Sequence, residues 1–226
     1  MNMAAGSEYN QRESDNLMNI VAVVYGVALT TALTRRADVL LSPLSAPYVI
    51  PSLALLGAVL LTALSFLGYV LAIGGDTPYH IAWTAGSGGG HSVFRYLADL
   101  LLAGLYVRLL FAATDVETGP DSKPRLASLV LAYTGVFAGA IVVRLLRRGQ
   151  ISWLAAAAAV ATLVAWFWVR GRTPTRAFDL WLEAALLAGV ILYGWLTHWL
   201  GYRAWTRAHP AAEQAAADQP GPVQDE

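Results

Sequence analysis

Long apolar blocks constrain this chain more than any other feature of its sequence. Each block is close to the ~20 residues that a helix needs to cross the hydrocarbon core of a bilayer. Charged residues make up only 13% of the chain, about half of the ~25% typical of soluble domains. The sequence therefore predicts an integral membrane protein. We expect six spans, at 16–34, 49–73, 93–113, 126–146, 151–169 and 178–202.

The spans are predicted to be α-helices. Inside hydrocarbon every backbone amide needs an internal partner, and a helix supplies that partner within the segment. A barrel strand would alternate apolar and polar residues with a period of two, which these blocks do not do. The helices of a soluble bundle would carry polar faces, and the second and fifth blocks have none. The expected fold is all-α, a polytopic membrane helix bundle with six transmembrane helices and short loops.

The chain divides into three parts by composition. Residues 1–15 form a polar N-terminal segment, residues 16–202 hold the six-helix transmembrane domain, and residues 203–226 form a polar C-terminal tail. We expect the tail to be disordered, because its composition cannot bury enough apolar surface to offset the entropy of ordering. Residues 37–48 are apolar but contain two prolines, which predicts an interfacial or re-entrant stretch.

The orientation in the membrane is not fixed by the basic residues. The positive-inside rule compares lysines and arginines on the two faces, and with six spans each face receives seven of them. We expect both termini on the cytoplasmic face, because the polar N-terminal segment carries no cleavable signal of the usual kind.

Composition also limits the partners and cofactors. The net charge is zero, so no nucleic-acid partner is indicated. The chain has no cysteine, which excludes disulfides and thiolate ligands. Its four histidines do not combine with acidic residues at the spacing of a zinc site. We expect no metal, no cofactor and no catalytic residue. The expected surroundings are the lipid bilayer.

Six charged residues fall within the predicted spans, Arg95, Asp99, Arg108, Arg144, Asp179 and Glu183, and four of them are candidates for pairing. An ionisable side chain at mid-bilayer costs ~2.5–3.5 kcal/mol on insertion scales and indicates function by default. Arg108 and Glu183 should lie at similar depth near one face, and Asp99 and Arg144 near the other. We expect these to form two interhelical ion pairs. The alternative is that they anchor helix ends near the interfaces, since long arginines reach toward water.

A polar stripe runs along one face of the second span. Thr62, Ser65 and Tyr69 follow at helical spacing. They are candidates for a hydrated path through the membrane. The alternative is helix packing, in which the hydroxyl groups bond to a backbone carbonyl one turn earlier.

Small residues recur at intervals of four in two spans. Ala22, Gly26 and Thr30 lie in the first, and Gly135 and Gly139 in the fourth. Such stripes allow two helix backbones to approach closely. They predict helix packing within the chain or an interface between copies of it.

Two functions fit this sequence. The first is a small channel or transporter that acts as a homo-oligomer, favoured by the chain length, the intramembrane charges and the polar stripe. The second is a membrane accessory or interaction subunit that transports nothing, favoured by the many packing stripes. Nothing in the sequence predicts an enzyme.

Overall fold

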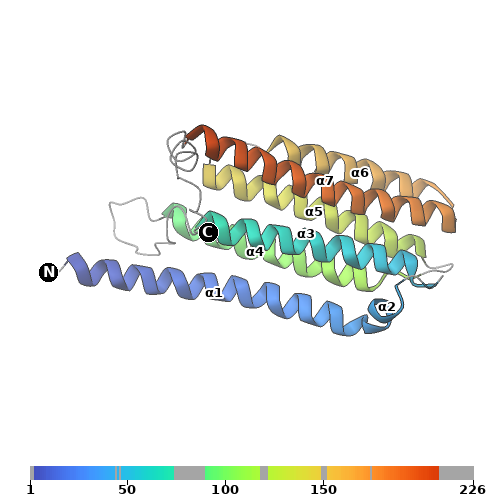
Figure 1. Ribbon diagram of the computed structural model, residues 1–226, viewed down its shortest axis with the longest axis horizontal. Coiled ribbons are helices and arrows are strands. Elements are labelled where there is room, and N and C mark those ends of the chain that lie inside the picture. Colours follow the sequence, from blue (N-terminus) through green and yellow to red (C-terminus); the bar gives the residue numbers. More distant parts are fainter. Residues whose placement is uncertain are drawn as a thin grey trace, which may run out of the picture.

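The fold is all-α, as the sequence predicts. The computed structural model describes residues 3–43, 45, 47–73, 90–117, 122–148, 152–173 and 175–208. Within these ranges the chain forms seven helices (Figure 1). They are α1 (Met3–Arg35), α2 (Ala37–Leu41), α3 (Val49–Ile73), α4 (Gly90–Thr114), α5 (Ser122–Arg148), α6 (Trp153–Gly171) and α7 (Arg176–Ala208).

Five of these helices contain a segment long and apolar enough to cross a membrane. The segments are Val49–Tyr69, Tyr96–Thr114, Ser122–Leu146, Trp153–Gly171 and Arg176–Leu200. A shorter apolar stretch, Asn19–Arg35, lies in α1. The chain is therefore a multi-pass membrane protein with five candidate spans and one shorter apolar helix, and it contacts the lipid bilayer.

The helix bounds follow the apolar blocks closely, with a difference at each end of the chain. The range of α3 is the predicted one, and α2 lies in the stretch expected to be interfacial or re-entrant. However, α1 begins at Met3 and takes in most of the polar N-terminal segment. Alanine, glutamate, glutamine and arginine in that segment favour a helix. The helix therefore continues through these polar residues, although the apolar block does not include them. At the other end, α7 continues to Ala208 and includes the first six residues of the tail that we expected to be disordered. Residues 209–226 of the predicted tail lie outside the described residues.

The six long helices lie nearly parallel to the long axis of the molecule, and successive long helices run in opposite directions (Figure 1). Helix α4 packs against α1, α3 and α5. Helix α5 also packs against α6, and α7 packs against α3 and α6. The main core lies where α1, α3, α4 and α5 meet, and its fully buried side chains include Val21, Leu61, Leu109 and Leu129.

Helix α6 presents a broad apolar surface to the outside. Val160, Val164 and Phe167 are each 62% exposed. Apolar patches of this kind are rare on monomeric soluble proteins and mark contact with a membrane or with another protein. The outside of α6 therefore matches a hydrocarbon surrounding.

The two glycines of the fourth predicted span are used for packing within the chain. A β-carbon on Gly139 would lie 2.8 Å from Cδ1 of Leu105 and 3.0 Å from Cδ1 of Leu102. A β-carbon on Gly135 would lie 3.5 Å from Cδ2 of Leu105. The glycines thus let α5 approach α4 closely. Gly26 differs, because nothing lies within 4 Å of the position of its β-carbon.

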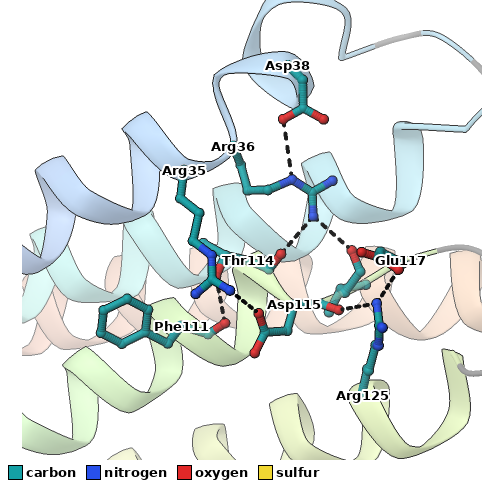
Figure 2. A network of polar contacts seen from close by, with 9 residues as sticks. Arg35, Arg36, Asp38, Phe111, Thr114, Asp115, Glu117 and Arg125 are labelled. Atoms are coloured by element: carbon teal, nitrogen blue, oxygen red, sulfur yellow. Dashed lines mark hydrogen bonds and ion pairs between the residues drawn. The ribbon is translucent and has the colours of Figure 1, made fainter.

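Three arginines hold α1, α4 and α5 together at the end where α1 and α4 finish, and Figure 2 shows this group. We call Arg35, Arg36 and Arg125 the arginine clamp. The Arg36 guanidinium donates to the Thr114 carbonyl at 2.7 Å and to the Val116 carbonyl at 3.1 Å. The last carbonyls of a helix have no partner within it, and a cation there also opposes the negative end of the helix dipole. Arg36 therefore closes the end of α4.

The other two arginines of the clamp form more exposed ion pairs. Arg35 lies 3.2 Å from the Asp115 carboxylate, with both side chains 54% exposed. Arg125, from the first turn of α5, pairs with Glu117 and donates to the Asp115 carbonyl at 3.3 Å. The segment that leaves α4 is thus held from α1 on one side and from α5 on the other (Figure 2).

Candidate functional site

The candidate site starts with two acidic residues in the opening turns of α7. Thr175 precedes this helix, and its hydroxyl accepts a hydrogen bond from the Phe178 amide at 3.3 Å. Threonine at this position satisfies one of the free amides that begin every helix. Asp179 and Glu183 follow four residues apart, which places both on one face of α7. Both are buried, so that face points into the bundle.

Glu183 is the more deeply buried of the two acidic residues. Its side chain is among the largest that are fully buried, and the residue is 1% exposed. Neither of its carboxylate oxygens has a hydrogen-bond partner among the described residues. Buried polar groups in proteins nearly always have a partner. Glu183 is therefore held in the interior without contributing a bond to the fold.

A second unpartnered group, the phenol of Tyr133 on α5, lies close to this carboxylate. Tyr133 is 1% exposed, and its hydroxyl also lacks a hydrogen-bond partner among the described residues. The phenol is within electrostatic range of Glu183. Its oxygen would be only 2.6 Å from a β-carbon on Gly57 of α3. Helices α3, α5 and α7 therefore converge on one place where two buried polar groups are left over.

Asp179 connects this place to the end of the bundle where α5 and α7 begin. The hydroxyl of Ser122, the first residue of α5, donates to the Asp179 carboxylate at 3.2 Å. Both residues are 7% exposed. We call Asp179, Glu183, Tyr133 and Ser122 the buried acid site. The outer residues of this site, Ser122 and Asp179, share a hydrogen bond. The inner residues, Glu183 and Tyr133, have no hydrogen-bond partner among the described residues.

The structure does not bring Arg108 to Glu183, although the sequence led us to expect an ion pair between them. Arg108 is exposed on α4, and neither oxygen of Glu183 has a hydrogen-bond partner in the part of the chain that the structure describes. The reason lies in the arrangement of the helices, since α4 packs against α1, α3 and α5 while α7 packs against α3 and α6. Equal depth in the membrane did not make these two residues neighbours.

The other expected pair, Asp99 with Arg144, stays a prediction. Asp99 is buried on α4 at 4% exposure. Arg144 is exposed near the end of α5, and its guanidinium donates to the Ser152 hydroxyl at 3.2 Å. That hydroxyl in turn accepts from the Ala155 amide at 3.4 Å and so caps the start of α6. Arg144 thus ties the end of α5 to the start of α6.

The polar stripe of α3 lies in the packed interior. Thr62 is fully buried, and its hydroxyl donates to the Ala58 carbonyl one turn earlier at 2.7 Å. Ser65 is within hydrogen-bonding range of the Tyr106 phenol on α4. Tyr69 is partly buried against the core. Thr62 therefore agrees with the packing alternative, in which the hydroxyl donates to a backbone carbonyl of its own helix. Ser65 faces a neighbouring helix.

The sequence reading missed the phenol and the serine of the buried acid site. The spacing of Asp179 and Glu183 was visible in the sequence, but Tyr133 lies in an apolar block and Ser122 in a polar connection. A signal that could have pointed to Tyr133 is its place within a predicted span, because a buried phenol usually has a hydrogen-bond partner. Among the described residues no group of three or more acidic or histidine side chains could hold a metal ion.

Comparison of the chain with models of protein families, with curated proteins and with solved structures gives no significant match.

Proposed function

We propose that this chain is a small membrane transport protein, a channel or carrier in which an ion passes or binds at the buried acid site. In this proposal α1 is a sixth membrane span. The apolar stretch of α1, Asn19–Arg35, has 17 residues, and at ~1.5 Å per residue it is ~26 Å long, at the short end of what crosses the ~30 Å hydrocarbon core. Six spans place both termini on one face, which we propose to be cytoplasmic.

The observation that carries this proposal is the unpartnered carboxyl of Glu183. A buried carboxylate without donors or a nearby cation is strongly disfavoured. A side chain that served only to stabilise the fold would have a partner, as Asp179 has in Ser122. Ionisable residues inside a membrane protein commonly mark the route of an ion or a proton. Glu183 is therefore best explained as a binding group for something that arrives and leaves.

The proposal includes assembly into a homo-oligomer. Ala22, Gly26 and Thr30 follow one another at intervals of four on α1. Gly26 is not needed for close packing inside the chain, because the space around its backbone is open. In membranes, small residues at this spacing allow two helices to come into close contact. The outer face of α1 is thus the proposed contact between copies.

The test is ion flux through the purified protein in sealed liposomes. Fluorescent indicators for pH and for potassium or sodium would report flux after an imposed gradient. We expect flux with the unchanged protein and its loss with Glu183→Gln, which keeps the size of the side chain and removes its ability to ionise. The matched control is Glu117→Gln, the same change at an exposed carboxylate on the connection after α4, and it should retain flux.

Absence of flux from the unchanged protein under every gradient would contradict the transport proposal. It would favour the accessory or interaction subunit instead. Equal loss of flux in the Glu183 and Glu117 variants would show that the effect is not specific to the buried acid site.

A further inference from the structure

We infer that Glu183 and Tyr133 form a proton-binding site that opens only toward the end of the bundle where α5 and α7 begin. This inference deepens the proposed function, on which it rests for the role of the proton as the transported ion. The binding of the proton itself can be measured whether or not the chain transports anything.

The small number of ligands favours a proton over a metal cation. Hard cations such as magnesium and calcium take about six to eight oxygen ligands. Here Glu183 offers two oxygens and Tyr133 one, and the described residues contain no acidic or histidine group of three that could hold a metal. Carbonyl oxygens within helices are already used by the helix. A proton needs only one lone pair of the carboxylate, to which it adds without releasing another group.

Among the described residues, no positively charged group bonds to Glu183 and could replace the proton. The groups within electrostatic range are Asp179 on α7 and the Tyr133 phenol on α5. Helix α3 presents Gly57 at this place. Helix α6 meets this part of α7 with apolar residues, Val169 and Trp166. The neutral acid is therefore the form of Glu183 that this site accommodates.

Access to Glu183 differs between the two directions along α7. Toward the start of the helix, Asp179 and Ser122 form a polar pair one turn away. In the other direction the inward residues Leu186 and Val190 are apolar and belong to the packed core. The next inward polar residue of α7 after Glu183 in that direction is Tyr193, ten residues and ~15 Å further on. A proton can thus be relayed from one end of the bundle, while packed side chains separate Glu183 from the other.

The test uses dicyclohexylcarbodiimide, an apolar reagent that attacks protonated carboxyl groups in membranes. The acid proton moves to a nitrogen of the reagent and the carboxylate oxygen adds to its central carbon. The adduct then rearranges to a stable N-acylurea, with no leaving group. Peptide mapping by mass spectrometry locates the label. We expect labelling at Glu183 that increases as the pH falls, and no label at Glu117.

Sidedness is tested with proteoliposomes in which all molecules have one orientation, checked by protease access to a C-terminal tag. The pH is changed on one side at a time. We expect labelling of Glu183 to follow the pH on the side where α5 and α7 begin and to ignore the other side. Labelling that follows the opposite side, or both sides equally, would overturn the one-sided site.

Two variants separate the outcomes. Glu183→Gln should lose the label completely, and Tyr133→Phe should keep the label while shifting its pH profile. A profile that Tyr133→Phe leaves unchanged would remove the phenol from the site. Flux measured on the same proteoliposomes distinguishes the two proposals. Flux without labelling at Glu183 overturns proton binding alone, and labelling without flux overturns transport alone.

Discussion

The hydroxyl oxygen of Tyr133 lies 2.6 Å from the position that a β-carbon would take on Gly57. Non-bonded atoms do not approach a β-carbon this closely, so only glycine at this position leaves room for the phenol. The α-carbon of Leu187 lies 3.9 Å from the same point, which brings α7 to the same place. Close approach of helices at glycine is a common form of packing in membranes. Here it sets the phenol of α5 against α3, within electrostatic range of the carboxyl of α7.

Gly57→Ala should therefore destabilise the protein through a clash with Tyr133. Forcing one extra carbon into a packed core costs ~1–3 kcal/mol. Tyr133→Phe removes the clashing oxygen. Because this hydroxyl has no hydrogen-bond partner among the described residues, its loss alone should be close to neutral. We expect the double variant to recover most of the loss. The measurement is thermal unfolding of the detergent-solubilised protein.

Gly68→Ala is the matched control on the same helix. Nothing lies within 4 Å of the β-carbon position of Gly68, and alanine favours a helix over glycine by ~1 kcal/mol. This variant should be as stable as the unchanged protein or more so. If Gly57→Ala behaved like Gly68→Ala, the close contact between Gly57 and Tyr133 would not exist in the protein.

Ser122→Ala should weaken the contact between α5 and α7. The Ser122 hydroxyl donates to the buried carboxylate of Asp179, and a hydrogen bond to a charged group contributes ~1.5–3 kcal/mol. Ser128→Ala, an exposed position on the same helix, should change the unfolding temperature little. A double-mutant cycle with Asp179→Ala isolates the pair. Additive effects of the two changes would show that the hydrogen bond contributes nothing to stability.

The sequence was sufficient to predict the helices but not which of them are neighbours. The block 49–73 gave the bounds of α3 directly, since apolar length and backbone satisfaction are local properties. The start of α1 was missed, because helix formation continues through residues 3–15, where the apolar pattern stops. Helix propensity thus decides where a helix can form, whereas the need for apolar residues in the membrane applies to only part of that helix.

The site was predictable only in its part that lies on one helix. Asp179 and Glu183 share a face of α7 by spacing alone. The partner of that face depends on how all the long helices pack, and depth in the membrane does not determine it. Arg108 therefore seemed a suitable partner for Glu183, while the groups within electrostatic range of Glu183 include Asp179 and Tyr133. Gly57, which makes room for that phenol, carries no signal of this role in the sequence.

Arg36 of the arginine clamp should matter more for stability than Arg35 beside it. Arg36 is largely buried, with 13% of its side chain exposed, and it binds two carbonyls at the end of α4. Its loss leaves these acceptors without their donor, which costs ~1–3 kcal/mol. Arg35 makes only an exposed ion pair, of a kind that contributes ~0–1 kcal/mol. Thermal unfolding of Arg36→Ala and Arg35→Ala compares them directly, and equal losses would contradict the capping role of Arg36.

The number of membrane crossings can be settled with three reporters, placed at the N-terminus, after Gly119 and after Gln214. If α1 crosses the membrane, the two termini share one compartment and the reporter after Gly119 lies in the other. If α1 lies on the surface, the N-terminal reporter shares the compartment of the one after Gly119. We expect the first pattern. Because each face carries seven basic residues, two or three added lysines in the loop after α3 should bias the orientation measurably.

Gly26→Leu should separate the copies of a homo-oligomer without disturbing the single chain. Gly26 is exposed and nothing lies within 4 Å of its β-carbon position, so we expect a single chain to accommodate leucine, whose helix propensity exceeds that of glycine. In an interface that depends on close contact of small residues, the same side chain would force the two α1 helices apart.

Gly104→Leu is the control, because Gly104 on α4 is also open. Native mass spectrometry should then show a smaller assembly for Gly26→Leu and an unchanged one for Gly104→Leu. Equal assemblies in both variants, with the unchanged protein oligomeric, would mean that copies meet on another face, and the broad apolar surface of α6 would become the next one to test.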